Sequence, residues 1–301
     1  MTETFFFVLA IAWIEAPLLL AAGFAKCAPL AWAALGGLLS ERSGIINIGL
    51  EGMMLIGAFF AVLGVGLTGS PWAGVGCALL SGAVTGLLHA VLCIHGRTDQ
   101  IISGMGINLI ALGLTGMLLS RIFDAYGNSP TVEKLPVFSE TLALSPLHLC
   151  LLLVLAGIIL LIYYTRTGLN LRACGEDPGV VRSAGIWVNG YRYAAVTLGG
   201  ALAGIGGAQL SISDVSQFTT GMTNGRGFIA LAALICSGWR PGRALLICWL
   251  FGMAEAGAER LQTPFPEIPS RAMLALPFAV ALIVLALRPQ QTRPPAALGK
   301  Q

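Results

Sequence analysis

The sequence has few charged residues and lacks the common signatures of hydrolytic and ATP-hydrolysing enzymes. Only 10% of its 301 residues are charged, whereas a soluble globular domain has about a quarter. The patterns HExxH, GxSxG and GxxxxGK[ST] do not occur. We therefore expect that the chain is not an enzyme, and that any ATP hydrolysis on which it depends takes place on another polypeptide.

Metal sites, disulfides and nucleic-acid binding are also not predicted. The seven cysteines are scattered, most of them within apolar runs, and no CxxC pair occurs; they are typical of small buried hydrophobic side chains. His89 and Cys93 are four residues apart, but two ligands do not make a zinc site. The net charge of +3 is too small to indicate nucleic acid as a partner. We expect no cofactor on this chain.

Long apolar runs are what the sequence has in abundance, since 56% of its residues are hydrophobic. A run of 18 or more apolar residues is long enough to cross the hydrocarbon core of a bilayer as a helix. Such runs are too long and too apolar for barrel strands. The sequence thus predicts an all-α polytopic membrane protein with about ten transmembrane segments, at residues 5–25, 28–41, 45–67, 73–95, 101–121, 146–164, 193–213, 226–238, 243–258 and 270–288.

The basic residues orient these segments, because cytoplasmic loops are enriched in Lys and Arg. With residues 166–192 placed in the cytoplasm, eleven of the 17 basic residues fall inside and six, namely Lys26, Arg121, Lys134, Arg226, Arg260 and Arg271, fall outside. Both termini then lie in the cytoplasm. We expect a membrane domain over residues 1–288 and a disordered cytoplasmic tail over residues 289–301.

Residues 166–192 are the longest polar segment of the chain, and long apolar runs flank them on both sides. Within this segment Asp177 is expected to cap a short helix, with Pro178 at its first position. Gly185 is expected to end it. The pattern is compatible with a surface helix that docks on another protein, and equally with an ordinary solvated loop.

Several polar residues fall within the predicted segments, where they are costly and often functional. Asn47 and Glu51 are four residues apart, so the pattern predicts that both occupy one helix face. Glu51 either lines a polar path or locks helix packing, and Glu15 has the same two interpretations. Other candidates for lining a path, or for joining helices by hydrogen bonds or packing, are Asn108, Gln209, Phe218 and Asn224.

Two halves of the chain, residues 28–121 and 193–288, each hold four predicted segments and start on opposite sides of the membrane. Both place a Gly-rich, polar-interrupted segment second. This arrangement is typical of the inverted repeats of transporters, in which the substrate path lies between the halves.

Three segments in this order resemble a known family. The stretch Ser40–Phe59 (SERSGIINIGLEGMMLIGAF) resembles the signature of membrane permeases of nucleoside ABC importers, within the branched-chain amino acid and simple-sugar permease superfamily. Gly168–Ile186 (GLNLRACGEDPGVVRSAGI) is similar to the coupling loop of that family, and Gly225–Arg243 (GRGFIALAALICSGWRPGR) resembles a further family region. One departure is that Gly179, rather than an Ala pair, follows the coupling-loop proline.

The resemblance implies a type II ABC importer fold in a bacterial or archaeal cytoplasmic membrane. It implies a second, homologous permease subunit, two ATPase domains that bind ATP and Mg²⁺, and an external substrate-binding lipoprotein. The chain would form the path for a nucleoside or purine-like solute. It would contact the ATPase through a coupling helix within residues 176–185 and its surroundings, namely Arg172, Gly175, Glu176, Asp177, Pro178, Ala184 and Gly185.

Two alternatives remain open from the sequence. The same family pattern includes permeases for riboflavin and simple sugars, so the resemblance does not fix the solute. A protein of another class, an ion-coupled secondary transporter, would use Glu51 and Glu15 as proton or sodium sites.

Overall fold

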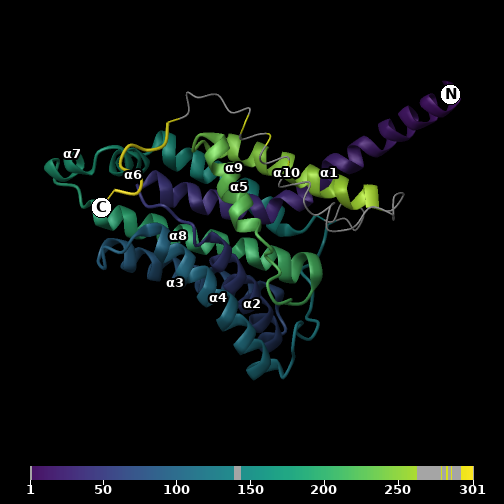
Figure 1. The fold of residues 1–301 in the computed structure, drawn as a ribbon, viewed down its shortest axis with the longest axis horizontal. Helices are drawn as coiled ribbons and strands as arrows, with labels where there is room; N and C mark the ends of the chain where they lie inside the picture. The colour runs from purple at the N-terminus through teal and green to yellow at the C-terminus, as the bar shows by residue number, and fades with distance from the viewer. Residues whose placement is uncertain are drawn as a thin grey trace.

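A computed structural model of the protein describes residues 2–138, 144–262 and 293–300, and the single positions 279, 283 and 286. These residues form a helical bundle (Figure 1). Its elements are α1 (Thr2–Arg42), α2 (Leu50–Thr68), α3 (Pro71–Ile94), α4 (Gln100–Phe123), α5 (Pro146–Tyr164), α6 (Arg166–Glu176), α7 (Pro178–Ser183), α8 (Val188–Ala208), the π-helix η1 (Gln209–Val215), α9 (Arg226–Ser237) and α10 (Pro241–Gln262).

Six stretches of the described helices are long and apolar enough to cross a membrane. They are Leu18–Arg42 within α1, the whole of α2, α3, α4 and α5, and Val188–Val215, which joins α8 to η1. This confirms the prediction of an all-α protein with several membrane helices. The expected ten spans and the inverted repeats are not confirmed, because α9 has only 12 residues and residues 270–288 lie largely outside the described part of the chain.

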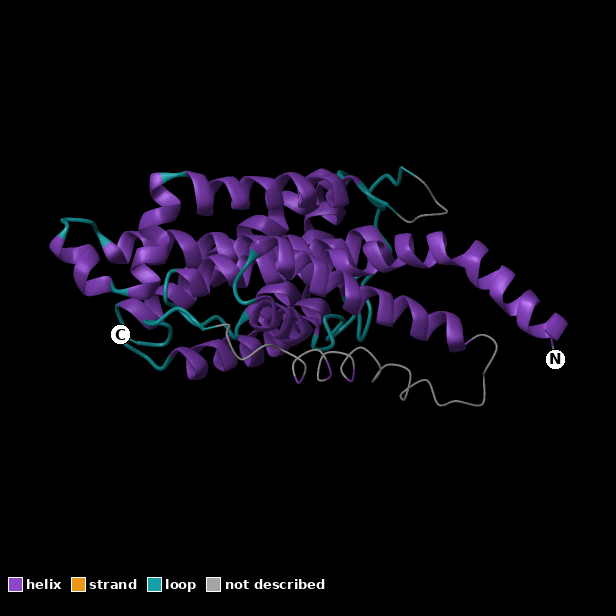
Figure 2. Ribbon diagram, turned by 90° about the horizontal axis from the view of Figure 1, so that it is seen from above, coloured by secondary structure: helices purple, strands orange, loops and turns teal. Residues whose placement is uncertain are grey.

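The first two predicted segments, 5–25 and 28–41, form one continuous helix rather than two. Lys26, which suggested a loop between them, lies inside α1, and its Nζ is 2.5 Å from the Glu259 carboxylate of α10. As a result, the N-terminus lies at the opposite end of the molecule from α7, and α1 extends past the bundle there (Figures 1 and 2). The cytoplasmic placement of both termini stays a prediction.

Helix α8 lies at the centre of the bundle, where it contacts α1, α2 and α3. Glycines allow this close approach, since a Cβ atom at Gly200 would lie 2.4 Å from the carbonyl oxygen of Gly82 in α3. A Cβ at Gly57 of α2 would likewise lie 2.4 Å from the carbonyl oxygen of Gly204. Small residues permit such backbone contact between membrane helices, which favours dispersion and weak hydrogen bonds.

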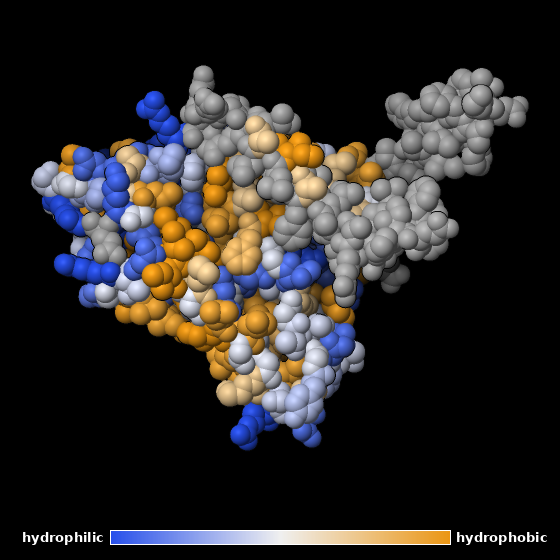
Figure 3. Space-filling model, viewed as in Figure 1, coloured by the Kyte–Doolittle hydropathy of each residue, from blue (hydrophilic) through white to orange (hydrophobic). Residues whose placement is uncertain are grey.

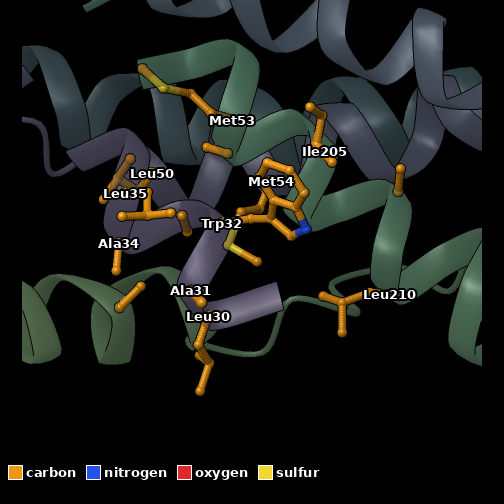
Figure 4. Close-up of a cluster of buried hydrophobic side chains, with 14 of the residues drawn as sticks. Leu30, Ala31, Trp32, Ala34, Leu35, Leu50, Met53, Met54, Ile205 and Leu210 are labelled. Atoms are coloured by element: carbon orange, nitrogen blue, oxygen red, sulfur yellow. The ribbon is translucent and has the colours of Figure 1, made fainter. Parts of the chain in front are cut away.

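The same helices enclose the core. Trp32 of α1 and Met54 of α2 meet at its centre, and both approach the backbone of Gly206 in α8 (Figure 4). Among the other core residues that the figure labels are Leu30, Leu35, Leu50, Met53, Ile205 and Leu210. Large, fully buried apolar side chains therefore fix the positions of α1, α2 and α8, which place the site described below.

The outer helices present apolar side chains to the surroundings. Exposed examples on α3, α4 and α5 are Leu80, Val84, Ile102, Leu109, Ile110, Leu153 and Leu160. Figure 3 shows a broad hydrophobic surface over the middle of the molecule, with hydrophilic residues gathered at the end that holds α7. This distribution is expected of helices whose outer faces contact lipid.

The end of the chain lies against the α7 end of the molecule. The backbone N–H of Ala297 donates to the carbonyl oxygen of Gly175 at 2.8 Å, and that of Gly299 donates to Gly44 at 3.2 Å. Pro295 and Ala297 are buried. Residues 293–300 thus differ from the predicted disordered tail, because backbone groups of α6 and of the turn after α1 provide hydrogen-bond partners.

Candidate functional site

A cavity of about 340 Å³ lies between α2, α4 and the turn that leads into α9. Its polar lining residues come from all three elements, and apolar side chains of α2, α4 and α9 surround them. The lining residues are Glu51, Gly52, Leu55, Met105, Asn108, Leu109, Leu112, Gly221, Thr223, Asn224 and Phe228. We call this the Glu51 cavity. It brings together three of the six residues predicted to line a path.

Glu51 joins α2 to the start of α9. Its Oε1 accepts a hydrogen bond from the backbone N–H of Gly225 at 2.8 Å, and its Oε2 accepts one from Gly227 at 2.7 Å. The first N–H groups of a helix have no partner within the helix and attract negative charge. A Cβ at Gly227 would lie 2.5 Å from the Glu51 Cα, so only glycine allows this approach. Glu51 therefore locks α9 in place while it also lines the cavity.

Asn108 ties α4 to α2 in a similar way. Its Oδ1 accepts a hydrogen bond from the backbone N–H of Gly52 at 2.8 Å, and its Nδ2 donates to the carbonyl oxygen of Ile48 at 3.1 Å. The amide thus satisfies backbone groups where the segment before α2 becomes helical. Asn108 holds one wall of the cavity in position.

Asn224 and Phe228 provide the freer face of the cavity. Asn224 has a φ of +42°, a left-handed conformation that asparagine tolerates better than most residues. Its exposed side-chain amide makes no hydrogen bond with the described residues. The Phe228 ring is 46% exposed. An open amide beside an aromatic ring suits a flat, heteroatom-rich solute.

Asn47 lies outside this cavity, and the prediction that it shares a helix face with Glu51 is wrong. Helix α1 ends at Arg42 and Gly44 has a φ of +94°, so residues 45–49 form a non-helical link and α2 begins only at Leu50. The buried Asn47 amide instead contacts Ser40 Oγ at 3.3 Å and Met53 Sδ at 3.6 Å.

Gln209 and Phe218 also lie elsewhere. Gln209 is buried in η1, where its Nε2 donates to Ser213 Oγ at 3.0 Å. Phe218 is fully buried, and its ring meets that of Phe59 edge-on at 5.3 Å between centroids. Phe218 thus anchors the connection between η1 and α9 to α2, whereas Gln209 makes its bonds within η1 and to Ser145.

The predicted surface helix is present as α7, with the expected ends. Asp177 Oδ1 accepts hydrogen bonds from the backbone N–H groups of Gly179 at 2.9 Å and Val180 at 3.1 Å, and Pro178 occupies the first turn. Ala184 follows the last residue of α7. Gly185 has a φ of +76°, which is the left-handed backbone conformation that commonly ends an α-helix.

The residues before α7 form a helix that was not predicted from the sequence. In α6, Arg172 lies over the Tyr163 ring at 5.7 Å, and Gly175 packs so closely on α1 that a Cβ would lie 2.3 Å from the Arg42 carbonyl oxygen. Glu176 Oε2 accepts a hydrogen bond from the backbone N–H of Ala296 at 3.2 Å. Arg166–Glu176 was not predicted to be a helix because its composition is mostly polar. Its buried residues, which include Leu171 and Cys174, form a narrow stripe.

Two large apolar side chains are exposed at α7 and in the turn that follows it. Val180 is 64% exposed and Trp187 is 75% exposed. Val181, on the other face of α7, is buried against Cys174 and Val188. The helix is therefore anchored by one side and exposes the other.

His89 does not belong to a metal site within the described residues, which contain no group of three potential ligands. Its Nδ1 lies 2.9 Å from Ser103 Oγ, and its Nε2 lies 3.0 Å from the carbonyl oxygen of Ile46. Both ring nitrogens therefore take part in hydrogen bonds that join α3, α4 and the link before α2.

The role of Gly227 and the cavity positions Met105 and Leu109 were not predicted from the sequence. The stretch Gly225-Arg226-Gly227 was a usable signal, because two glycines around a helix start indicate close approach by another group. The two α4 residues carry no such signal, since they are ordinary members of an apolar run.

Comparison with known proteins agrees with this architecture. Residues 19–287 match the family described as "Branched-chain amino acid transport system / permease component". The nucleoside ABC transporter permease protein NupC of Lactococcus lactis is 37% identical over 282 residues, which cover 86% of this chain and 88% of that protein. The guanosine ABC transporter permease protein NupQ of Bacillus subtilis is 34% identical, with the same coverage.

A third relative differs in the solute that its name gives. The putative glucose ABC transporter permease protein TsgC13 of Haloferax volcanii is 35% identical over 254 residues, covering 81% of this chain and 77% of that protein. All three relatives are named as permease proteins of ABC transporters. With the family match extending over most of its length, the chain belongs to the permease family of branched-chain amino acid transport systems.

Proposed function

We propose that the chain is the permease subunit of an ATP-driven importer and forms the path for a nucleoside or purine-like solute. The observation that carries this proposal is the Glu51 cavity, where Asn108, Asn224 and Phe228 meet. The names of two relatives, a nucleoside permease and a guanosine permease, support the same class of solute.

The chemistry of the cavity fits a neutral heterocycle. The Asn224 amide offers both a donor and an acceptor, and the Phe228 ring offers a face for stacking. Both Glu51 oxygens already accept hydrogen bonds from the N–H groups of Gly225 and Gly227. A carboxylate engaged in this way leaves the amide and the ring as the main groups that would contact a neutral solute.

A second permease subunit would complete this path. The cavity borders a face on which Met105, Leu109 and Phe228 are exposed. A homologous subunit packed on that face would enclose the cavity between two chains. We place this pair in a bacterial or archaeal cytoplasmic membrane, with an external lipoprotein that delivers the solute. An inverted-repeat relation between the two halves of the chain remains part of the proposal.

ATP would act on this path through α7. Two partner ATPase domains, which bind ATP and Mg²⁺, would contact Val180 and Trp187 and close on ATP. Because Val181 anchors α7 to α6 and α8, displacement of α7 would move α8. Helix α8 packs on α2 and α3, so the displacement would alter the wall of the cavity. The mechanism needs two states whose balance the ATPase shifts.

The alternatives differ in what they require of the same residues. A riboflavin or simple-sugar permease would use the same cavity, and the name of one relative, a glucose permease, is compatible with a sugar. An ion-coupled carrier would need Glu51 free to exchange a proton or sodium ion. Both Glu51 oxygens instead accept backbone hydrogen bonds, and the Glu15 side chain lies outside the described part of the structure.

The direct test is solute uptake by the assembled transporter in proteoliposomes, with guanosine, uridine, riboflavin and glucose offered in parallel. Asn224→Gly removes the amide but tolerates the left-handed backbone, and Phe228→Leu removes the ring. Each change should lower nucleoside uptake about tenfold, as expected from about 1.4 kcal/mol of lost contact.

Leu80→Ala on the exposed outer face of α3 is the control and should leave uptake unchanged. Nucleoside uptake that survives both cavity substitutions, or that needs an ion gradient rather than ATP, would contradict the proposal.

A further inference from the structure

A second polar cavity of about 340 Å³ lies at the α7 end of the molecule, apart from the Glu51 cavity. Three arginines from three separate segments line it: Arg97 in the turn between α3 and α4, Arg182 in α7, and Arg192 in α8. We call it the arginine cavity. Its other lining residues are Ile45, Cys93, Ile94, Gln100 and Asn189.

The arginine cavity carries positive charge that no acidic side chain of the described residues neutralises. No described acidic residue lines it, and none of its arginines forms an ion pair with a carboxylate in that part of the chain. Asp99, the nearest acid in sequence to Arg97, caps α4 by accepting from the backbone N–H groups of Ile101 and Ile102. Three guanidinium groups held together without a counter-ion repel one another.

Two buried donors in the lining residues lack acceptors. Arg192 is only 4% exposed; its Nε donates to the Ser43 carbonyl oxygen at 3.2 Å, but its buried Nη2 has no partner. Gln100 is also 4% exposed; its Oε1 accepts from the Ile46 N–H at 2.7 Å, and its Nε2 has no partner. Buried donors are nearly always satisfied. Both missing partners are acceptors, and the charge around them is positive.

We propose that the arginine cavity binds the phosphate group of an anionic ligand. A phosphate has several acceptor oxygens and suits the planar, multi-donor guanidinium groups of arginine. A bound phosphate would link Arg182 of α7 to Arg192 of α8 and to the α3–α4 turn. It would therefore help to fix the helix on which the ATPase is proposed to dock, whichever solute the permease carries.

The surroundings of the cavity favour a phospholipid headgroup as the source of the phosphate. The exposed apolar side chains of Val91 and Leu92 near the end of α3, and of Ile101 and Ile102 at the start of α4, lie beside the turn that holds Arg97. Acyl chains would contact these residues while the headgroup enters the cavity. A soluble phosphate ester offers the same anionic group without the chains.

The test uses the purified, assembled transporter and measures its thermal unfolding with added anions. One arm contains inorganic phosphate, one a short-chain phosphatidylglycerol, and one the matching phosphatidylcholine, all at ionic strength matched with chloride. Protection by both anionic additives indicates a general phosphate site. Protection by phosphatidylglycerol alone indicates a lipid site. Either result supports the proposal.

The variants separate the cavity from general charge effects. Arg97 has a φ of +50°, so Arg97→Gly keeps the turn, and it is combined with Arg182→Gln on the exposed α7. This pair should weaken the apparent affinity for the protective anion about tenfold or more, whereas Arg121→Gln at the far end of α4 should not change it. The proposal would be overturned if chloride or phosphatidylcholine protected the wild-type transporter against thermal unfolding as well as the anionic additives do. It would also be overturned if the anionic additives protected the double variant as well as they protect the wild type. Neither readout depends on solute uptake.

Discussion

The Glu51 carboxylate of α2 accepts a hydrogen bond from the backbone N–H of Gly227 at 2.7 Å, across 176 positions of the chain. This contact fixes the start of α9 at the wall of the proposed solute cavity. Of the two roles that the sequence leaves open for Glu51, a lock on helix packing and a place on a polar path, the first is present as a helix cap supplied from another helix.

We expect Glu51→Gln to destabilise the protein by about 1–3 kcal/mol, because one of two part-buried N–H groups loses its acceptor. The measurement is the unfolding temperature of the purified transporter. Glu133→Gln, at an exposed loop position, is the control and should have little effect. An unchanged unfolding temperature with abolished uptake would instead indicate that Glu51 exchanges an ion.

The glycine contacts of α8 predict a second outcome. A Cβ at Gly204 would lie 2.3 Å from the carbonyl oxygen of Ala78, and a backbone carbonyl cannot rotate aside. Gly204→Ala should therefore push α3 and α8 apart and cost about 1–3 kcal/mol. At Gly113 of α4 nothing lies within 4 Å of the position that an added methyl group would occupy, so Gly113→Ala should be neutral or stabilising. Equal unfolding temperatures for the two variants would refute close α3–α8 packing.

The contact between Glu176 and the chain end gives a third prediction. Ala296→Pro removes the N–H that donates to the Glu176 carboxylate, and the loss should cost about 0.5–1.5 kcal/mol. We expect faster hydrogen exchange in α6, measured by mass spectrometry on the transporter. Ala296→Gly keeps the donor and should leave exchange nearly unchanged. If both variants exchange alike, the chain end does not stabilise α6.

Much of the fold was predictable because it depends on local signals. The apolar run at residues 146–164 coincides with α5, and the Asp177-Pro178 pair marks the start of α7. These features require only helix length and helix caps, which neighbouring residues decide. The predictions that were wrong concern contacts between distant segments.

Lys26 and Asn47 show why those contacts were not predictable. The charge of Lys26 suggested a loop, but Glu259 compensates it and α1 continues through that position. Spacing placed Asn47 on the helix of Glu51, but the positive φ of Gly44 sends the chain through a non-helical link. Only tertiary partners decide such cases, just as the cavity joins Asn108 and Asn224 from segments far apart in the sequence.

The central claim is that α7 contacts an ATPase, and cross-linking from Val180→Cys tests it most directly. Burial raises the pKa of the nearby Cys174 thiol, which lowers its reactive thiolate fraction at neutral pH. Cys174 should therefore contribute little cross-linking of its own. In membrane vesicles with the full transporter, the variant should form a cross-link to the ATPase subunit, and ATP should change its yield. Arg121→Cys, at the far end of α4, is the control and should form none. Absence of the α7 cross-link, or labelling of Val180→Cys from outside the cell by a membrane-impermeant reagent, would contradict the account.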